Sequence, residues 1–185
     1  MPKLIILDRD GVINYDSNEF IKSPDEWKPI KGSLEAIARL NQALYRVVVI
    51  TNQSGLSRGL FTFDVLNQIH QKMYKQLADV NGRIEAIFFC PHSDKENCKC
   101  RKPRSGLFHN LSNRLGIPLN DVPMVGDSLR DLQAARSVNA SPILVLTGKG
   151  QQTLRQMEKN FDDVFDDVPV YDNLAAFVDN LLEES

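Results

Sequence analysis

Short apolar runs alternate with helical patterns along the whole 185-residue chain. Each run places Val, Ile or Leu on consecutive positions, which is typical of strands covered on both faces of a sheet. Strands that alternate with helices are joined in parallel by right-handed crossovers. We therefore expect an α/β fold, a three-layer sandwich around a mostly parallel sheet. The predicted strands are Leu4–Leu7, Arg46–Ile50, Ala86–Phe89, Val122–Val125 and Pro142–Leu146.

The segments between these runs carry apolar residues at helical spacing. Thr62 and Asp64 precede one such pattern, and Gly116 with Pro118 ends another, as expected at helix termini. Further helices are predicted near Thr153–Lys159 and Leu174–Leu182. The periodic positions are Leu34, Ile37, Ala38 and Leu44; Val65, Leu66, Ile69, Met73 and Leu77; Leu107, Leu111 and Leu115; and Leu129, Leu132, Ala135 and Val138.

Charge and length restrict the class of protein. The 22 Lys and Arg nearly balance the 24 Asp and Glu, so we expect no nucleic-acid partner. No stretch approaches the roughly 20 apolar residues of a membrane span. We expect one domain over residues 1–185, a cytoplasmic location and a monomer. The acidic pairs Asp162-Asp163 and Asp166-Asp167 are interpreted as a solvated loop, with an additional cation site as the alternative.

Polar residues follow the predicted strands, at the edge of the sheet where open α/β folds bind their ligands. Asp8 and Asp10 follow the first strand and point the same way, about 6–7 Å apart along an extended chain. Two such carboxylates can share a hard cation, with one as nucleophile and the other as acid and base. Thr51 to Gly55 follow the second strand and can cradle phosphoryl oxygens. Asp127 follows the fourth and could complete a Mg²⁺ site.

Each pattern also has a structural interpretation. Asp8 and Asp10 could form a solvated acidic turn, and Thr51 to Gly55 a plain loop. Asp127 could be only a helix N-cap. Lys102, in Arg101-Lys102-Pro103, could neutralise a transferring phosphoryl group or belong to a surface basic pair.

Taken in chain order, Asp8/Asp10, Thr51, Lys102 and Asp127/Asp131 resemble the four motifs of the haloacid-dehalogenase-like phosphohydrolases, over about residues 4–150. The resemblance implies a Rossmannoid fold and Mg²⁺-dependent hydrolysis of a phosphomonoester through an aspartyl-phosphate. By the same resemblance, Asp8 is the nucleophile and Asp10 protonates the leaving group and then activates water. Thr51 and Lys102 hold the phosphoryl oxygens, and Mg²⁺ binds Asp8, the Asp10 carbonyl and Asp127.

All three cysteines lie in one segment. Cys90, His92, Cys98 and Cys100 supply three thiols and an imidazole, a complete tetrahedral Zn²⁺ set with no position left for water. We interpret residues 90–103 as a structural zinc loop that fixes where Arg101 and Lys102 are delivered. Reduced thiols and a disulfide are the alternatives. The histidines His70 and His109 fall in helical segments and are interpreted as surface or packing residues.

The spacing leaves no room for a large cap domain. One helix and one strand occupy most of the interval from Asp10 to Asn52, and a helix, a strand and the zinc loop fill the next. The substrate must then be held by the loops Asn14–Pro29, Gly55–Phe61 and Pro91–Arg104. The expected substrate-binding residues are Asp16, Ser17, Asn18, Glu19, Asn52, Gln53, Ser54, Arg58 and Arg101, with Arg104 as a further cation.

The arginines of these loops suit a second phosphate, because a guanidinium binds phosphate through paired hydrogen bonds. The zinc loop and the segment Thr51 to Gly59 are similar to those of sugar-bisphosphate phosphatases in this family, although some of these carry Lys at the position of Ser128. A small phosphorylated sugar is therefore the expected substrate. The alternatives are a histidinol-phosphate phosphatase, a polynucleotide 3′-phosphatase, which the net charge of −2 argues against, and a non-catalytic zinc-stabilised binding module.

Overall fold

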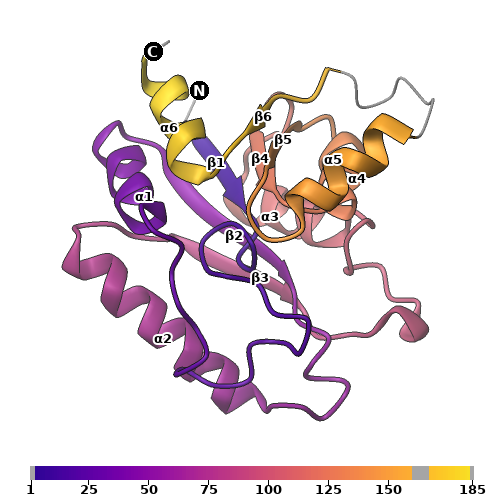
Figure 1. Ribbon diagram of the computed structural model, residues 1–185. Helices are drawn as coiled ribbons and strands as arrows, with labels where there is room; N and C mark the ends of the chain where they lie inside the picture. The colour runs from indigo at the N-terminus through magenta and orange to yellow at the C-terminus, as the bar shows by residue number, and fades with distance from the viewer. Residues whose placement is uncertain (1–2, 160–166, 184–185) are drawn as a thin grey trace.

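The computed structural model describes residues 3–159 and 167–183. Six parallel strands form one sheet in the order β3-β2-β1-β4-β5-β6 (Figure 1). The five predicted strands are present, each within two residues of its expected bounds. The sixth strand, β6, was not predicted. The strands are β1 (Leu4–Leu7), β2 (Arg46–Asn52), β3 (Ala86–Cys90), β4 (Pro123–Gly126), β5 (Ser141–Val145) and β6 (Val170–Tyr171).

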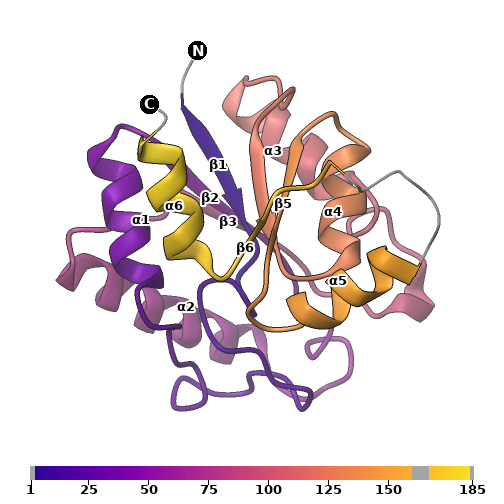
Figure 2. The same ribbon diagram turned by 45° about the horizontal axis from the view of Figure 1, so that its top comes forward.

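Helices cover both faces of the sheet, which gives the expected three layers (Figure 2). On one face α1, α2 and α6 bury their apolar sides against Ile5, Leu7, Val47 and Val49. On the other face α3 and α4 pack against Ile6, Val48 and Ile50, and α5 packs near Leu144. The helices are α1 (Ser33–Gln42), α2 (Phe63–Asp79), α3 (Gly106–Leu115), α4 (Leu129–Arg136), α5 (Gly150–Lys159) and α6 (Leu174–Glu183).

Two residues that were assigned to helical patterns lie beyond the helix ends. Leu44 follows α1 with a φ of 67°, and 82% of its surface is exposed. The chain turns there, because the Tyr45 N–H donates to the Leu40 carbonyl (2.9 Å) and ends the helix. Val138 lies after the end of α4 and packs half-buried against the core beneath α3 and α4. In contrast, Thr62 caps α2 as predicted, accepting a hydrogen bond from the Val65 N–H.

Strand β1 lies between β2 and β4, so successive crossovers leave it in opposite directions. The carboxyl ends of β1 and β4 therefore flank the topological switch point, where such sheets bind ligands. Residues 8–62 are all described and contain no inserted domain, in agreement with the expected absence of a large cap.

None of the described helices is long and apolar enough to cross a membrane. Of the acidic pairs, Asp162, Asp163 and Asp166 lie outside the described residues. Asp167 forms an ion pair with Arg136. The Arg136 side chain is 37% exposed.

Candidate active site

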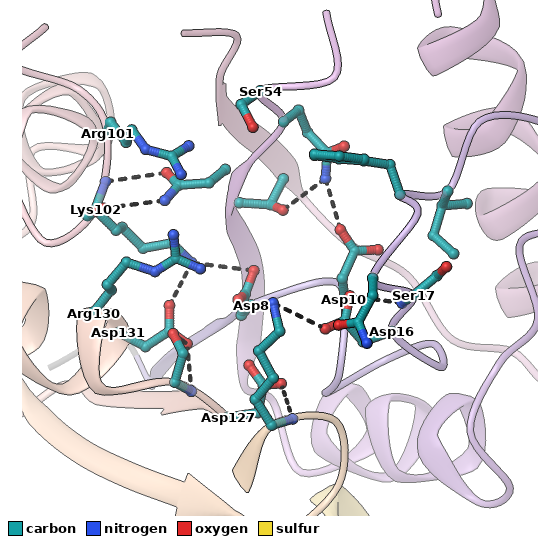
Figure 3. Close-up of a pocket in the computed structure, with 18 of the residues that line it drawn as sticks. Asp8, Asp10, Asp16, Ser17, Ser54, Arg101, Lys102, Asp127, Arg130 and Asp131 are labelled. Atoms are coloured by element: carbon teal, nitrogen blue, oxygen red, sulfur yellow. Dashed lines mark hydrogen bonds and ion pairs between the residues drawn. The ribbon is translucent and has the colours of Figure 1, made fainter. Parts of the chain in front are cut away.

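A cavity opens at the carboxyl ends of β1, β2 and β4 (Figure 3). It brings together most of the residues that the sequence singled out. The predicted residues that line it are Asp8, Asp10, Asp16, Ser17, Asn18, Thr51, Asn52, Gln53, Ser54, Arg58, Arg101, Lys102 and Asp127. Glu19 is exposed and does not line the cavity, although it belongs to the same loop.

Lys102 is a buried cation held between two carboxylates. Its Nζ lies 3.1 Å from Asp8 Oδ1 and 2.7 Å from Asp131 Oδ1, and it donates to the Ile50 carbonyl (2.8 Å). Burial lowers the pKa of Lys102, but the charges of Asp131 and Asp8 outweigh burial and raise it. The lysine therefore stays charged beside Asp8, as stabilisation of a transferring phosphoryl group requires.

The buried carboxylate of Asp131 is fixed by the start of α4. Its Oδ2 accepts hydrogen bonds from the backbone N–H (3.0 Å) and hydroxyl (2.7 Å) of Ser128, which form a capping box. The N-cap of α4 is thus Ser128, and the N-cap interpretation of Asp127 is wrong. Ser128 and Asp131, which had no assigned role, together orient Lys102.

Asp127 approaches the backbone of two neighbouring turns. Its Oδ2 accepts from the Lys149 backbone N–H (2.7 Å). A Cβ at Gly11, where φ is +84°, would lie 2.1 Å from this Oδ2, so only glycine fits there. Burial raises the pKa of Asp127 well above its ordinary value, and the charges of Asp131 and Asp8 raise it further.

The carboxylates of Asp8, Asp127 and Asp131 fit a hard cation. One oxygen of each lies within 4.8 Å of the others, and oxygen ligands suit Mg²⁺. The pKa of Asp8 is raised to about 7, chiefly by burial. The Lys102 charge opposes this rise, and the charges of Asp131 and Asp10 add to it. Three clustered carboxylates with one lysine leave negative charge that a divalent cation would offset.

Asp10 is held by a buried arginine that the sequence analysis did not single out. Arg9 Nε donates to Asp10 Oδ1 (3.0 Å), and Nη2 reaches both carboxylate oxygens at 2.9 and 3.0 Å. Asn14 and Gln53 each donate a further hydrogen bond of 2.9 Å. Burial alone raises the pKa of Asp10, but the Arg9 charge and these hydrogen bonds outweigh burial and lower it.

The amides at the end of β2, Asn52 and Gln53, hold other residues of the cavity in place. Asn52 donates to the Lys102 carbonyl (3.1 Å) and accepts from the Lys102 N–H (3.0 Å), so both polar atoms of its side chain bind backbone. Gln53 Nε2 bridges Asp10 and the Thr51 hydroxyl (3.0 Å). These two amides were predicted to bind substrate. In the structure they tie β2 to the zinc loop and to the residues after β1.

Of the three arginines expected near a second phosphate, Arg58 and Arg101 line the cavity. The Arg58 guanidinium lies 5.7 Å from the centre of the Phe20 ring, joining two loops. Arg101 pairs with Asp94 (2.6 Å) and donates to the His92 carbonyl (3.2 Å). Arg104 does not line this cavity, because it turns back to the Cys98 carbonyl (2.5 Å).

Cys90, His92, Cys98 and Cys100 converge on one point. Their ligand atoms lie within 4.8 Å of one another, with Cys90 Sγ 3.1 Å from Cys100 Sγ and His92 Nδ1 3.3 Å from Cys100 Sγ. Sulfur ligands of a tetrahedral Zn²⁺ lie about 3.8 Å apart, given Zn–S bonds of about 2.3 Å. All three cysteines are free, so the disulfide alternative is wrong. The donor set and its spacing fit Zn²⁺.

The structure adds residues that the sequence analysis did not select. Arg130 and Lys149 line the cavity, and Lys149 Nζ lies 3.4 Å from Asp16. Lys149 follows β5, so the rule that selected Asp8 and Thr51 also points to it. His109 is exposed, as one interpretation held. His70 is buried, and its Nε2 lies 3.1 Å from Arg9 Nη1, a contact across 61 positions that no local pattern reveals.

Comparison with known proteins agrees with this geometry. Residues 99–170 match the family model described as HAD-hydrolase-like. The D-glycero-β-D-manno-heptose-1,7-bisphosphate 7-phosphatase of Bordetella bronchiseptica is 51% identical over 183 residues, which cover 99% of this chain and 99% of that protein. The chain belongs to the haloacid-dehalogenase-like hydrolases.

Other relatives of this HAD-like hydrolase agree. The phosphatase of the same name from Neisseria meningitidis serogroup A is 46% identical, over 99% of this chain and 96% of that protein. The crystal structure of the Bordetella bronchiseptica D,D-heptose 1,7-bisphosphate phosphatase, complexed with magnesium and phosphate, has a TM-score of 0.93 and covers 99% of both chains. These relatives confirm the predicted family and its sugar-bisphosphate branch, and the enzyme is a phosphatase.

Proposed function

We propose that this phosphatase removes the 7-phosphate of D-glycero-D-manno-heptose 1,7-bisphosphate. The observation that carries the proposal is one cavity in which Asp8 and Lys102 lie beside a second group of cations, among them Arg101 and Arg130. A bisphosphate needs both, because one phosphate reacts while the other is bound. The relatives are named for the β anomer of this sugar, and we propose that this chain acts on the same anomer.

The reaction follows from the positions of two carboxylates. An Asp8 oxygen forms a bond to the phosphorus while the bond from phosphorus to the sugar oxygen breaks. Arg9 lowers the pKa of Asp10 in the free enzyme, so Asp10 must take up a proton from solvent when the substrate binds, and it gives that proton to the departing oxygen. Asp10 then takes a proton from water as the water oxygen attacks the same phosphorus, which releases phosphate and restores Asp8. Lys102 and the Thr51 hydroxyl stabilise the phosphoryl oxygens in both steps.

Mg²⁺ would be held by Asp8, the Asp10 carbonyl and Asp127, where it would neutralise charge between the nucleophile and the phosphate. Burial and neighbouring carboxylates raise the pKa of Asp8 and of Asp127, so a cation is required to keep both ionised together. Asp131 lies near enough to contribute, but its oxygens are engaged by Lys102 and Ser128. We therefore assign Asp131 to positioning Lys102.

We propose that the second phosphate is bound by Arg58, Arg101 and Arg130. Arg130 forms no ion pair with any residue that the structure describes, and Figure 3 places its side chain on the same side of the cavity as Lys102. The remaining polar groups at the mouth, Asp16 to Asn18, would bind sugar hydroxyls.

We propose that Cys90, His92, Cys98 and Cys100 hold a structural Zn²⁺. The neighbouring contacts support this role, because Arg101 donates to the carbonyl of one ligand and Arg104 to that of another. Metal analysis of purified protein should find one zinc per chain. Its absence would contradict the assignment.

Three coarser expectations remain part of the proposal. We propose that residues 1–185 act as one phosphatase domain, that it is a monomer, and that it works in the cytoplasm. Three free thiols at a metal cluster support a reducing compartment. Size-exclusion chromatography with light scattering tests the monomer.

The experiment compares phosphate release from heptose bisphosphate and from histidinol phosphate, with and without Mg²⁺. We expect Mg²⁺-dependent release with the higher kcat/KM on the bisphosphate. Arg130→Gln should raise KM for the bisphosphate about tenfold, the loss of about 1.4 kcal/mol of binding, and leave a sugar monophosphate unaffected. Arg114→Gln, at an exposed position on α3, is the matched control. Preference for histidinol phosphate would overturn the substrate assignment.

A further inference from the structure

His70 is a buried histidine that the reaction as described does not use. It lies in α2, is 7% exposed, and packs its ring against Phe89 with 6.4 Å between ring centres. Its Nε2 lies 3.1 Å from Nη1 of Arg9. Helix α2 thus reaches the residue between the two aspartates that follow β1.

Only one assignment of hydrogens satisfies this contact. Arginine can only donate, so His70 Nε2 must accept, and the ring proton is on Nδ1. Burial and then the Arg9 charge lower the pKa of His70 to about 3, although the Asp10 charge opposes them, so the ring is neutral near pH 7. A neutral acceptor is what a buried guanidinium N–H requires, because an unpaired charged donor in the interior is costly.

The guanidinium that His70 contacts is the one that holds Asp10. Arg9 is fully buried and donates from Nε and Nη2 to the Asp10 carboxylate, while Nη1 donates to His70. The planar guanidinium fixes the directions of all its donors together. Holding Nη1 therefore fixes the plane in which the Asp10 carboxylate is gripped.

We propose that His70 is a positioning residue of the phosphatase, which accepts a hydrogen bond from Arg9 and so orients the Asp10 carboxylate toward the leaving-group oxygen. The inference rests on the proposed role of Asp10 as acid and base. Loss of the acceptor lets the guanidinium plane rotate, and proton transfer from Asp10 becomes slow. Reactions whose leaving group needs no proton are spared.

The test uses two substrates that differ in this need. An alkyl phosphate, here the heptose bisphosphate, needs a proton on the departing oxygen, whereas p-nitrophenyl phosphate releases a stable anion. kcat/KM reports the first step, the transfer to Asp8. His70→Asn should lower kcat/KM on the alkyl phosphate about tenfold to a hundredfold, part of the usual contribution of general acid catalysis. On p-nitrophenyl phosphate the change should stay below about threefold.

A matched variant separates positioning from packing. A Gln oxygen can reach the place of Nε2, and the Asn oxygen is too short to do so. We expect His70→Gln to restore near wild-type kcat/KM on both substrates. His70→Leu has no acceptor and should behave as His70→Asn, which keeps the test usable if one variant fails to fold. His109→Asn, at the exposed histidine of α3, should change neither rate.

The Asn variant should also give a burst of p-nitrophenolate followed by a slower steady rate, because activation of water by Asp10 limits the second step. A merely structural role would lower both substrates equally and give no burst, and that result would overturn the inference. Asp10→Asn serves as the reference. If it shows no dependence on the leaving group, the proposed role of Asp10 is wrong and the inference falls with it. If Asp10→Asn shows the dependence and His70→Asn does not, the inference alone is wrong.

Discussion

Acidification from pH 7 to pH 5 should destabilise the wild-type protein through His70. The ring is neutral in the folded state, where burial and then Arg9 lower its pKa to about 3. In the unfolded chain the same group has an ordinary pKa of 6.5. The unfolded state therefore binds the extra proton, and the stability present above pH 6.5 is lost as the pH falls toward 3.

The magnitude follows from the two pKa values. Between pH 7 and pH 5 the unfolded histidine changes from mostly neutral to almost fully charged, while the folded one stays neutral. The linkage gives a loss of about 2 kcal/mol over this interval, at about 1.4 kcal/mol per pH unit below the ordinary pKa. The loss hardly depends on how far the folded pKa is lowered, provided that it stays below about 4. It is a sizeable part of a typical domain stability of 5–15 kcal/mol.

The assay is urea unfolding at pH 7, 6 and 5 of the wild type and of His70→Gln, which lacks the titrating group. The raised pKa values of Asp8 and Asp127 act in the opposite direction, but they are common to both proteins and cancel in the difference. We expect the wild type to lose about 2 kcal/mol more than the variant between pH 7 and pH 5. Equal losses would refute the argument that the buried ring is neutral.

Three further changes test the site. Asp8→Asn should keep the fold and lower turnover by about 10⁴-fold or more, as loss of a nucleophile does, measured as phosphate release. Gly11→Ala should raise the Mg²⁺ concentration needed for half-maximal activity and destabilise the protein by about 1–3 kcal/mol, since its Cβ would lie 2.1 Å from Asp127 Oδ2. Gly59→Ala, also at positive φ but with no atom within 4 Å, is the control and should show the strain alone. Removal of the proposed zinc by a chelator, with Mg²⁺ restored, should raise KM more than it lowers kcat.

The strands and the motif residues could be predicted because both depend on local pattern. Consecutive Val and Ile in β2 mark a strand buried on both faces, and the residues that follow it must lie at the edge of the sheet. Strand β6 has only Val170 and Tyr171, too few for a pattern, and its pairing with β5 depends on where α5 returns the chain. The place of a residue that follows a long apolar strand can thus be predicted from the sequence. A short strand such as β6, which forms only because of tertiary packing, cannot.

The partners of the site residues could not be predicted, because they come from distant positions. Alternation along β1 suggests that Arg9 points away from Asp8 and Asp10, yet its long side chain returns to grip Asp10. Asn52 was expected to bind substrate from its position after the predicted strand Arg46–Ile50. Its amide instead holds the backbone of Lys102, 50 positions away. Residue type and position select candidates for a site, and only the packing decides which of them touch substrate.

The expected result of zinc removal follows from how the two neighbouring cations are held. Lys102 is buried. The Asn52 side chain holds its backbone, and the carboxylates of Asp8 and Asp131 hold its Nζ, and none of these contacts involves the zinc cluster. Arg101 instead depends on the loop itself, through the carbonyl of the proposed zinc ligand His92 and the exposed Asp94. Loss of the metal should therefore loosen Arg101, which we propose binds the second phosphate, and leave Lys102 in place. A fall in kcat with KM unchanged would show that Lys102 is positioned by the zinc cluster and not by the Asn52 side chain.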